Sequence, residues 1–155
     1  MAKKMALIAT KGALDMAYPP FILGSTAAAL GWDVQIFFTF YGLQLLRKDL
    51  SSVKISPLAN PAMPMPIPMP VMVQMLPGME SMATMMMKQK MKSKGVASLE
   101  ELRDLCLEAD VKFVACQMTV DLFEFKKSDF IDNIEYGGAA TFMKFAGESD
   151  VCLFI

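Results

Sequence analysis

The chain has 155 residues, enough for one ordinary domain with a substantial hydrophobic core. Its 15 basic residues are balanced by 16 acidic ones, so net charge gives no reason to expect a nucleic-acid partner. The chain contains no histidine, which excludes hydrolases with a histidine base, histidine-ligated zinc and histidine-ligated haem.

In chain order, the first third is predicted to form a strand at 5–10, a helix at 14–30, a strand at 34–39, a short helix at 41–47 and a fifth strand of the sheet at 53–55. Gly31 is a candidate C-cap of the first helix, and Pro19-Pro20 is expected to kink or delay that helix. The alternation resumes with a helix at 98–109, a strand at 111–115, a short helix from about 119, a helix at 139–145 and a strand at 151–155. Nearly continuous apolar strands that alternate with helices predict an α/β fold with a parallel sheet and helices on both faces.

A methionine- and proline-rich insertion at about 57–94 interrupts this single domain, 1–155. Seven of the nine prolines and eleven of the sixteen methionines fall within it. The segment 61–70 is incompatible with helix or central strand and predicts a polyproline-like arm. Helical spacing then begins, with methionines along one face at Met72, Met75, Met79, Met82 and Met86. Pro77-Gly78 interrupts this stripe, so two short helices are as consistent as one.

Four interpretations of this stripe remain open. It could pack on the protein's own core or on another subunit, or it could fit the groove of a partner protein. A membrane-surface helix with a lysine rim at 88–94 is a third possibility. Copper(I) binding by thioethers is the fourth, suggested by Met63 and Met65. No apolar run free of proline approaches the length of a membrane-spanning helix.

The three cysteines form no CxxC pair, so neither a thioredoxin motif nor a zinc ribbon is expected, and we predict no metal site and no cofactor. The apolar run before Lys11 is shorter than the core of a signal peptide. Unpaired thiols then indicate a reducing compartment, and we expect a cytoplasmic protein. Cys152, in an apolar strand, and Cys106, on the apolar face of a helix, are each expected to be core residues.

Cys116 is placed differently, because it lies where a buried strand ends and a helix begins. Ligands of parallel sheets gather at such strand ends, and a following helix dipole favours the thiolate. Thr119 is a plausible cap of that helix, and Lys11 could reach the same edge and lower the thiol pKa, whereas Asp121 would oppose this. A disulfide between Cys106 and Cys116 is not expected, because antiparallel helix and strand directions offset their Cα atoms by roughly 10 Å.

Several segments resemble the DsrE/DsrF-like sulfur-relay family, and they are 8–18, 37–43, 113–123 and 134–142. The resemblance covers most of the chain and is most specific at the cysteine-bearing strand end. It resembles the branch with a Met/Pro-rich insertion and two cysteines ten residues apart.

The resemblance implies a flavodoxin-like three-layer domain with four to five strands that forms homo-oligomers. It also implies that Cys116 accepts sulfane sulfur, as a persulfide or thiosulfonate, and passes it to a TusA-type carrier or another relay protein. Cys106 would be a secondary catalytic thiol. The candidate residues of the surrounding rim are Thr10, Lys11, Tyr41, Gln117, Gly137 and Gly138.

The first hypothesis is therefore a sulfur carrier or sulfurtransferase-like protein, with the distinction between carrier and enzyme left open. The alternative is a non-catalytic interaction module whose Met/Pro-rich arm docks on a partner protein or makes peripheral contact with a membrane surface.

Overall fold

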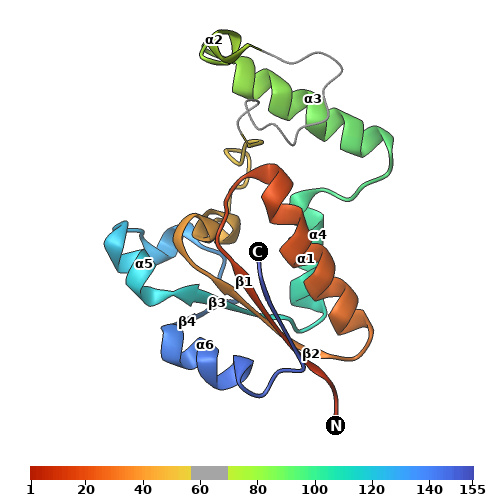
Figure 1. Cartoon of the computed structure of the whole chain (residues 1–155), viewed down its shortest axis with the longest axis vertical. Helices are drawn as coiled ribbons and strands as arrows, with labels where there is room; N and C mark the ends of the chain where they lie inside the picture. Colours follow the sequence, from red (N-terminus) through yellow and green to blue (C-terminus); the bar gives the residue numbers. More distant parts are fainter. Residues whose placement is uncertain (57–69) are drawn as a thin grey trace.

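A five-stranded parallel sheet forms the centre of the computed structural model, which describes residues 1–56 and 70–155 (Figure 1). Its strands are β1 (Lys4–Ala9), β2 (Asp33–Phe38), β3 (Lys112–Cys116), β4 (Glu135–Gly137) and β5 (Val151–Phe154). They lie in the order β4-β3-β2-β1-β5, with every pairing parallel. The predicted α/β class with a parallel sheet is confirmed. Strands β2, β3 and β4 are added in turn on one side of β1, and β5 is then added on its other side. The topological switch point therefore lies between β1 and β5.

The helical segments are α1 (Leu14–Ala29), η1 (Phe40–Leu46), α2 (Val71–Gln74), α3 (Met79–Ser93), α4 (Leu99–Glu108), α5 (Gln117–Leu122), η2 (Lys127–Asp129) and α6 (Ala139–Ala146). Helix α1 packs on β1, β2 and α4, whereas α6 packs on β1 and β4 from the other face (Figure 1). Helices on both faces are thus confirmed, although their coverage is unequal.

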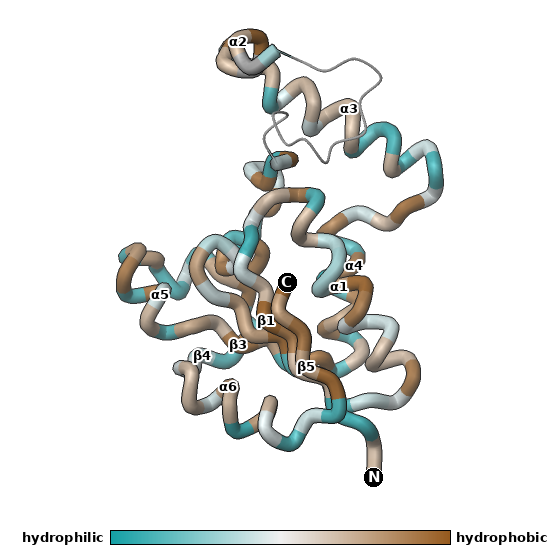
Figure 2. The backbone as a smooth tube through the Cα atoms, viewed as in Figure 1, coloured by the Kyte–Doolittle hydropathy of each residue, from teal (hydrophilic) through white to brown (hydrophobic). Residues whose placement is uncertain are grey.

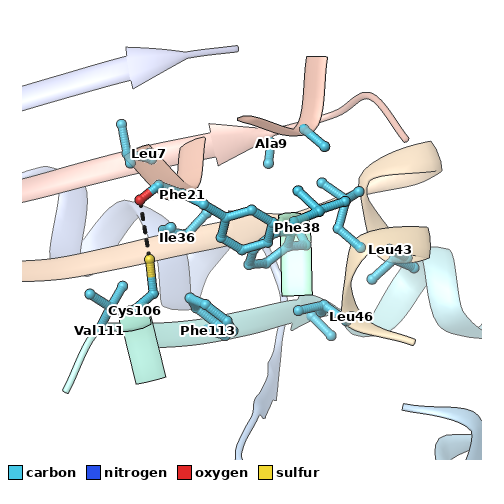
Figure 3. Packing of buried hydrophobic residues seen from close by; sticks show 14 of the residues in the cluster. Leu7, Ala9, Phe21, Ile36, Phe38, Leu43, Leu46, Cys106, Val111 and Phe113 are labelled. Atoms are coloured by element: carbon cyan, nitrogen blue, oxygen red, sulfur yellow. Dashed lines mark hydrogen bonds between the residues drawn. The ribbon is translucent and has the colours of Figure 1, made fainter. Parts of the chain in front are cut away.

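The unequal coverage produces a large core on one face of the sheet and a small one on the other. In the large core, Phe21 of α1 meets Phe38 and Phe113 of the sheet, with ring centroids 5.2–5.9 Å apart (Figure 3). In the small core, Phe37 stacks on Phe142 of α6 at 5.1 Å. Neighbouring strand residues point to opposite faces, so Phe37 and Phe38 contribute to different cores.

The expected strand at 53–55 is wrong. Val53 and Ile55 are buried in a loop, and Lys54 accepts a backbone hydrogen bond from Leu14 instead of pairing in the sheet. The fifth strand is β4, at the far edge. Edge strands are often short, and three residues including a glycine leave little apolar signal in the sequence.

Local sequence signals set most helix ends. Ser98 and Glu101 form the capping box at the start of α4, with both reciprocal hydrogen bonds present. Gly31 follows α1 with φ of 80°, as a C-terminal glycine does. Pro19-Pro20 does not delay α1, which begins at Leu14 and continues through both prolines.

The insertion forms two helices that extend away from the sheet (Figures 1 and 2). Helix α2 ends before Pro77-Gly78 and α3 begins after it, as one of the two open predictions had it. The expected polyproline-like arm at 61–70 lies almost wholly outside the described residues, as do Met63 and Met65. Among the described residues, none of the helices is both long and apolar enough to cross a bilayer.

The expectation that the methionine stripe packs on the protein's own core is wrong for most methionines of the stripe. The exposed methionines of α2, α3 and their connection are Met72, Met75, Met82, Met85 and Met86. Helix α3 is anchored instead by Met87 and Met91, which pack on the large core, and by the buried Thr84 hydroxyl, which accepts a hydrogen bond from the Ile55 N–H. The anchoring side chains turn the stripe outward.

Candidate functional site

Cys116 is the last residue of β3 and also the N-cap of α5, so its thiol lies at the carboxyl edge of the sheet. Its side chain belongs to the small core, beside Phe37 and Phe142, and is only 5% exposed. Helix α5 begins at Gln117, which makes Cys116 the cap, whereas Thr119, which the sequence suggested for that role, lies in the first turn.

Two threonines lie at the same strand end as Cys116, one after the neighbouring strand β2 and one in the first turn of α5. Thr39 follows β2, and its Oγ1 is 3.2 Å from Oγ1 of the fully buried Thr119. The N–H of Phe40 also donates to Thr119 Oγ1, at 3.4 Å. Phe40 has φ of 48°, an unfavourable conformation for an aromatic residue. The turn after β2 is therefore held against the first turn of α5 at the position of the sulfur.

The pKa of the Cys116 thiol is lowered. Burial acts to raise it, but polar contacts from the Thr119 hydroxyl and N–H, the Thr39 hydroxyl and the Met118 N–H together outweigh burial. The sulfur does not accept a fully formed capping hydrogen bond from α5 in this conformation. No charged side chain is among the causes of the shift. The expected effects of Lys11 and Asp121 on this thiol are therefore not seen.

Gly137 and Gly138 lie on the other side of Cys116. Gly137 is the register partner of Cys116 in the parallel pairing of β3 with β4, and Gly138 is the N-cap of α6. Among residues 1–56 and 70–155, no side chain caps α6, so its first backbone N–H groups lie at the carboxyl edge of the sheet without a side-chain partner from that part of the chain. These two candidates are thus adjacent to the thiol through the sheet.

The remaining rim candidates differ in their distance from the thiol and in the partners that their side chains contact. Gln117 follows Cys116 directly, but its amide donates to Asp121 at 2.7 Å. Tyr41 is exposed and stacks on Phe123 of the α5 segment, with centroids 6.1 Å apart. Thr10 uses both its N–H and its hydroxyl to bind the carbonyl of Ile155, so it ties β1 to the end of β5.

Thr10 and Lys11 follow β1, and β2 lies between β1 and β3. Two strand spacings correspond to roughly 10 Å, so neither residue is placed directly against the thiol by the sheet. The sequence located their common edge correctly but gave no information on strand order.

Cys106 is not brought to this site. Its Sγ lies in the large core, where it donates to the carbonyl of Phe21 at 3.2 Å (Figure 3). Burial raises the pKa of this thiol to about 12. A protonated, fully buried thiol on the far face of the sheet does not act as a second nucleophile in this conformation.

The prediction that Cys152 is a buried core residue is wrong, because Cys152 is exposed. Strand β5 is at the edge of the sheet, and three of its four residues are exposed. The apolar sequence of β5 looked like that of a central strand. All three cysteines are free thiols.

Sequence reasoning also missed an aromatic cluster at this edge. Phe123 contacts Phe40 and Tyr41 of η1 at centroid distances of 6.4 and 6.1 Å, and Phe125 at 5.5 Å. Phe40, Tyr41 and Phe123 are each more than one-third exposed. The residues are over eighty positions apart, so only the parallel pairing of β2 and β3 reveals the cluster.

The fold and the site together define the class of this protein: a small three-layer parallel α/β protein with a cysteine of lowered pKa at the end of a strand. The sequence matches the DsrE/DsrF/DrsH-like family over residues 1–154, and the chain belongs to that family. It is 67% identical to the sulfur carrier protein DsrE2 of Allochromatium vinosum, over 99% of this chain and 98% of that protein. It is 33% identical to the uncharacterized protein YrkE of Bacillus subtilis, over 99% and 97% respectively.

The structure also resembles the crystal structure of the ychN protein from E. coli. The TM-score is 0.56, with 99% of each chain covered and 12% sequence identity. This similarity concerns the fold alone.

Proposed function

We propose that this protein is a sulfur carrier in a sulfur relay and that Cys116 is the acceptor of sulfane sulfur. The observation that carries the proposal is the strand-end thiol with a lowered pKa at the edge of the sheet. Membership of the DsrE/DsrF/DrsH-like family and 67% identity to a protein named as a sulfur carrier support it.

The transfer needs only thiolate chemistry. The Cys116 thiolate attacks the outer sulfur of a donor persulfide, forming a new S–S bond as the donor's S–S bond breaks and the donor leaves as a thiolate. In the second step, an acceptor thiolate attacks the outer sulfur on Cys116 and releases the Cys116 thiolate. No oxidant is consumed, since the sulfane sulfur moves between two thiolates.

The loaded form is an anion, and the edge of the sheet offers neutral donors for it. The uncapped first turn of α6 presents backbone N–H groups beside Gly138, at the positive end of the helix dipole. The same groups suit a thiosulfonate. We propose Gly137 and Gly138 as the residues that let a bound anion approach this backbone.

The proposed recipient is a TusA-type carrier or another relay protein that presents a thiol. The exposed aromatic cluster of Phe40, Tyr41 and Phe123 adjoins the edge where such a partner must bind. Three free cysteines are consistent with a reducing cytoplasm as the site of this transfer.

Mass spectrometry of the reduced protein after incubation with a sulfane or thiosulfonate donor tests the proposal. Cys152→Ser is the reference protein, because the exposed Cys152 would otherwise react without specificity. We expect one reductant-reversible adduct in the reference, its loss in Cys116→Ser/Cys152→Ser and its retention in Cys106→Ser/Cys152→Ser. If the reference protein forms no adduct with any of these donors, the proposal is contradicted.

A second function is favoured by the exposed methionines of α2 and α3. Thioether side chains suit adaptable protein-binding surfaces, so the arm could dock on a partner protein or a membrane surface. Replacing Met82, Met85 and Met86 with serine tests this without disturbing the anchor at Thr84. Unchanged pull-down of relay partners and unchanged vesicle binding by the triple variant would contradict an interaction role for α3.

A further inference from the structure

We infer that Thr39 and Thr119 form a hydroxyl pair that donates a hydrogen bond to the sulfur of Cys116 and holds it, in thiolate and in sulfur-loaded form, at the edge of the sheet. The inference rests on the proposed function for its chemical meaning. The geometry that carries it is the contact of Thr39, Thr119 and the strained Phe40 N–H, from segments eighty residues apart, at the strand end that Cys116 occupies.

The hydrogen bonds leave one hydroxyl proton for the sulfur. Thr119 Oγ1 accepts the N–H of Phe40, and the two threonine oxygens share one proton at 3.2 Å. If Thr119 donates to Thr39, the Thr39 proton is free; if Thr39 donates to Thr119, the Thr119 proton is free. Thr39 follows Phe38, the register partner of Ala115, and Thr119 lies in the first turn of the helix that Cys116 caps, so both hydroxyls are at the strand end that carries the sulfur. Either arrangement therefore supplies one donor at that position, in agreement with the lowered pKa of the thiol.

A hydroxyl donor favours the anion over the thiol. A thiolate or persulfide anion only accepts hydrogen bonds, and a bond to a charged group is stronger than one to a neutral group. Thr119 is fully buried, so its hydroxyl has little water to compete for it. The pair therefore stabilises the Cys116 thiolate, as a neighbouring cation does at many reactive cysteines.

Charged groups do not provide an alternative source of this stabilisation. The titratable side chains on the neighbouring segments are Lys11, Tyr41, Asp121, Glu135, Tyr136 and Lys144. None of them is among the causes of the Cys116 shift, and Asp121 is bonded by the Gln117 amide. The chain has no histidine.

The backbone at Phe40 indicates that this arrangement is maintained against strain. A non-glycine aromatic residue at φ of 48° is uncommon, and such conformations persist only where surrounding contacts fix them. Here the conformation directs the Phe40 N–H to Thr119 Oγ1. The same turn is fixed by Gly42, which packs directly on the carbonyl of Ala9.

The experiment measures the pH dependence of Cys116 alkylation in the Cys152→Ser protein, with Thr39→Val and Thr119→Val added singly. Valine keeps the shape of threonine and removes the hydroxyl. We expect the midpoint to move to higher pH and alkylation at pH 7 to slow by roughly tenfold in each variant, since a donor to a charged group is lost. Thr39→Ser keeps the hydroxyl, so it should have the same alkylation midpoint as the Cys152→Ser protein.

Thr84→Val is the matched control. Thr84 also has a buried hydroxyl that accepts a backbone N–H, but it lies on α3 and takes no part in the Cys116 environment. This variant should lower the melting temperature without moving the alkylation midpoint. If Thr119→Val does not fold, Thr39→Ala provides a second test at the less buried member of the pair.

Valine variants that lower the melting temperature but keep the wild-type midpoint would overturn the inference and leave the pair as a purely structural link. This result is distinguishable from failure of the proposed function. Alkylation needs no sulfur donor, so the pair can be tested even if the reference protein accepts no sulfur.

Discussion

Cys106 and Cys116 are ten positions apart in the chain and lie on opposite faces of the sheet. Cys106 is in the core beneath α1, and Cys116 is in the core beneath α6. A disulfide between them would have to pass through the sheet, a stricter barrier than the offset expected from helix and strand lengths. The ten-residue spacing therefore does not indicate a cysteine pair in this conformation.

This separation predicts a distinct order of thiol labelling. With a neutral alkylating reagent near pH 7.5, we expect Cys152 and Cys116 to react in the folded protein and Cys106 to react only after unfolding. Exposure favours Cys152 and the lowered pKa favours Cys116, whereas Cys106 is buried and protonated. Peptide mapping after timed quenching measures this order. Labelling of Cys106 at the rate of Cys152 would contradict the packing described.

The raised pKa of Cys106 predicts a loss of stability at alkaline pH. The folded thiol stays protonated up to a pKa of about 12, whereas the unfolded thiol ionises around its ordinary pKa of 9.0. The contribution is therefore complete below pH 9 and declines as pH rises from 9 toward 12, by about 1.4 kcal/mol per pH unit.

Urea unfolding of the wild type and Cys106→Ser at pH 8 and pH 10 measures this effect. Serine keeps a donor for the Phe21 carbonyl and does not titrate in this range. Relative to the variant, the wild type should lose about 1.4 kcal/mol between the two pH values. Parallel losses in both proteins would show that the unfolded state gains nothing from ionising this thiol.

Gly42 and Gly138 should respond very differently to alanine. A Cβ at Gly42 would overlap the carbonyl of Ala9, whereas a Cβ at Gly138 meets no atom within 4 Å. We expect Gly42→Ala to cost at least about 2 kcal/mol and Gly138→Ala less than about 0.5 kcal/mol in unfolding free energy. Chemical denaturation compares the two. Equal costs would mean that the contact between η1 and β1 is looser than the structure has it.

The exposed edge at β5 predicts how copies of the chain associate. Phe154 is 73% exposed and Leu153 is also exposed, on a strand with one unpaired side. We propose that homo-oligomerisation, which the family resemblance implies, covers this edge. Phe154→Lys should then give a smaller particle in light scattering. Leu30→Lys replaces another exposed apolar side chain outside β5 and is the surface control. An unchanged mass for both variants would exclude this edge as the interface.

Apolar runs and capping signals in the sequence determined the α/β class, four strands, the capping box at Ser98 and the position of Cys116 at a strand end. These features depend on local periodicity and on residues that are neighbours in the chain. The same local reasoning failed at β4, because three residues at an edge carry too little pattern. It also failed at Cys152, because an apolar strand does not reveal what covers it.

Only the tertiary structure decided which residues surround Cys116. Strand order placed Gly137 beside it, moved Thr10 and Lys11 two strands away and assigned Cys106 to the opposite face. Thr39 and Thr119 meet because parallel strands end at a common edge, although eighty residues separate them. Such contacts arise from register and strand order, which local sequence patterns do not encode.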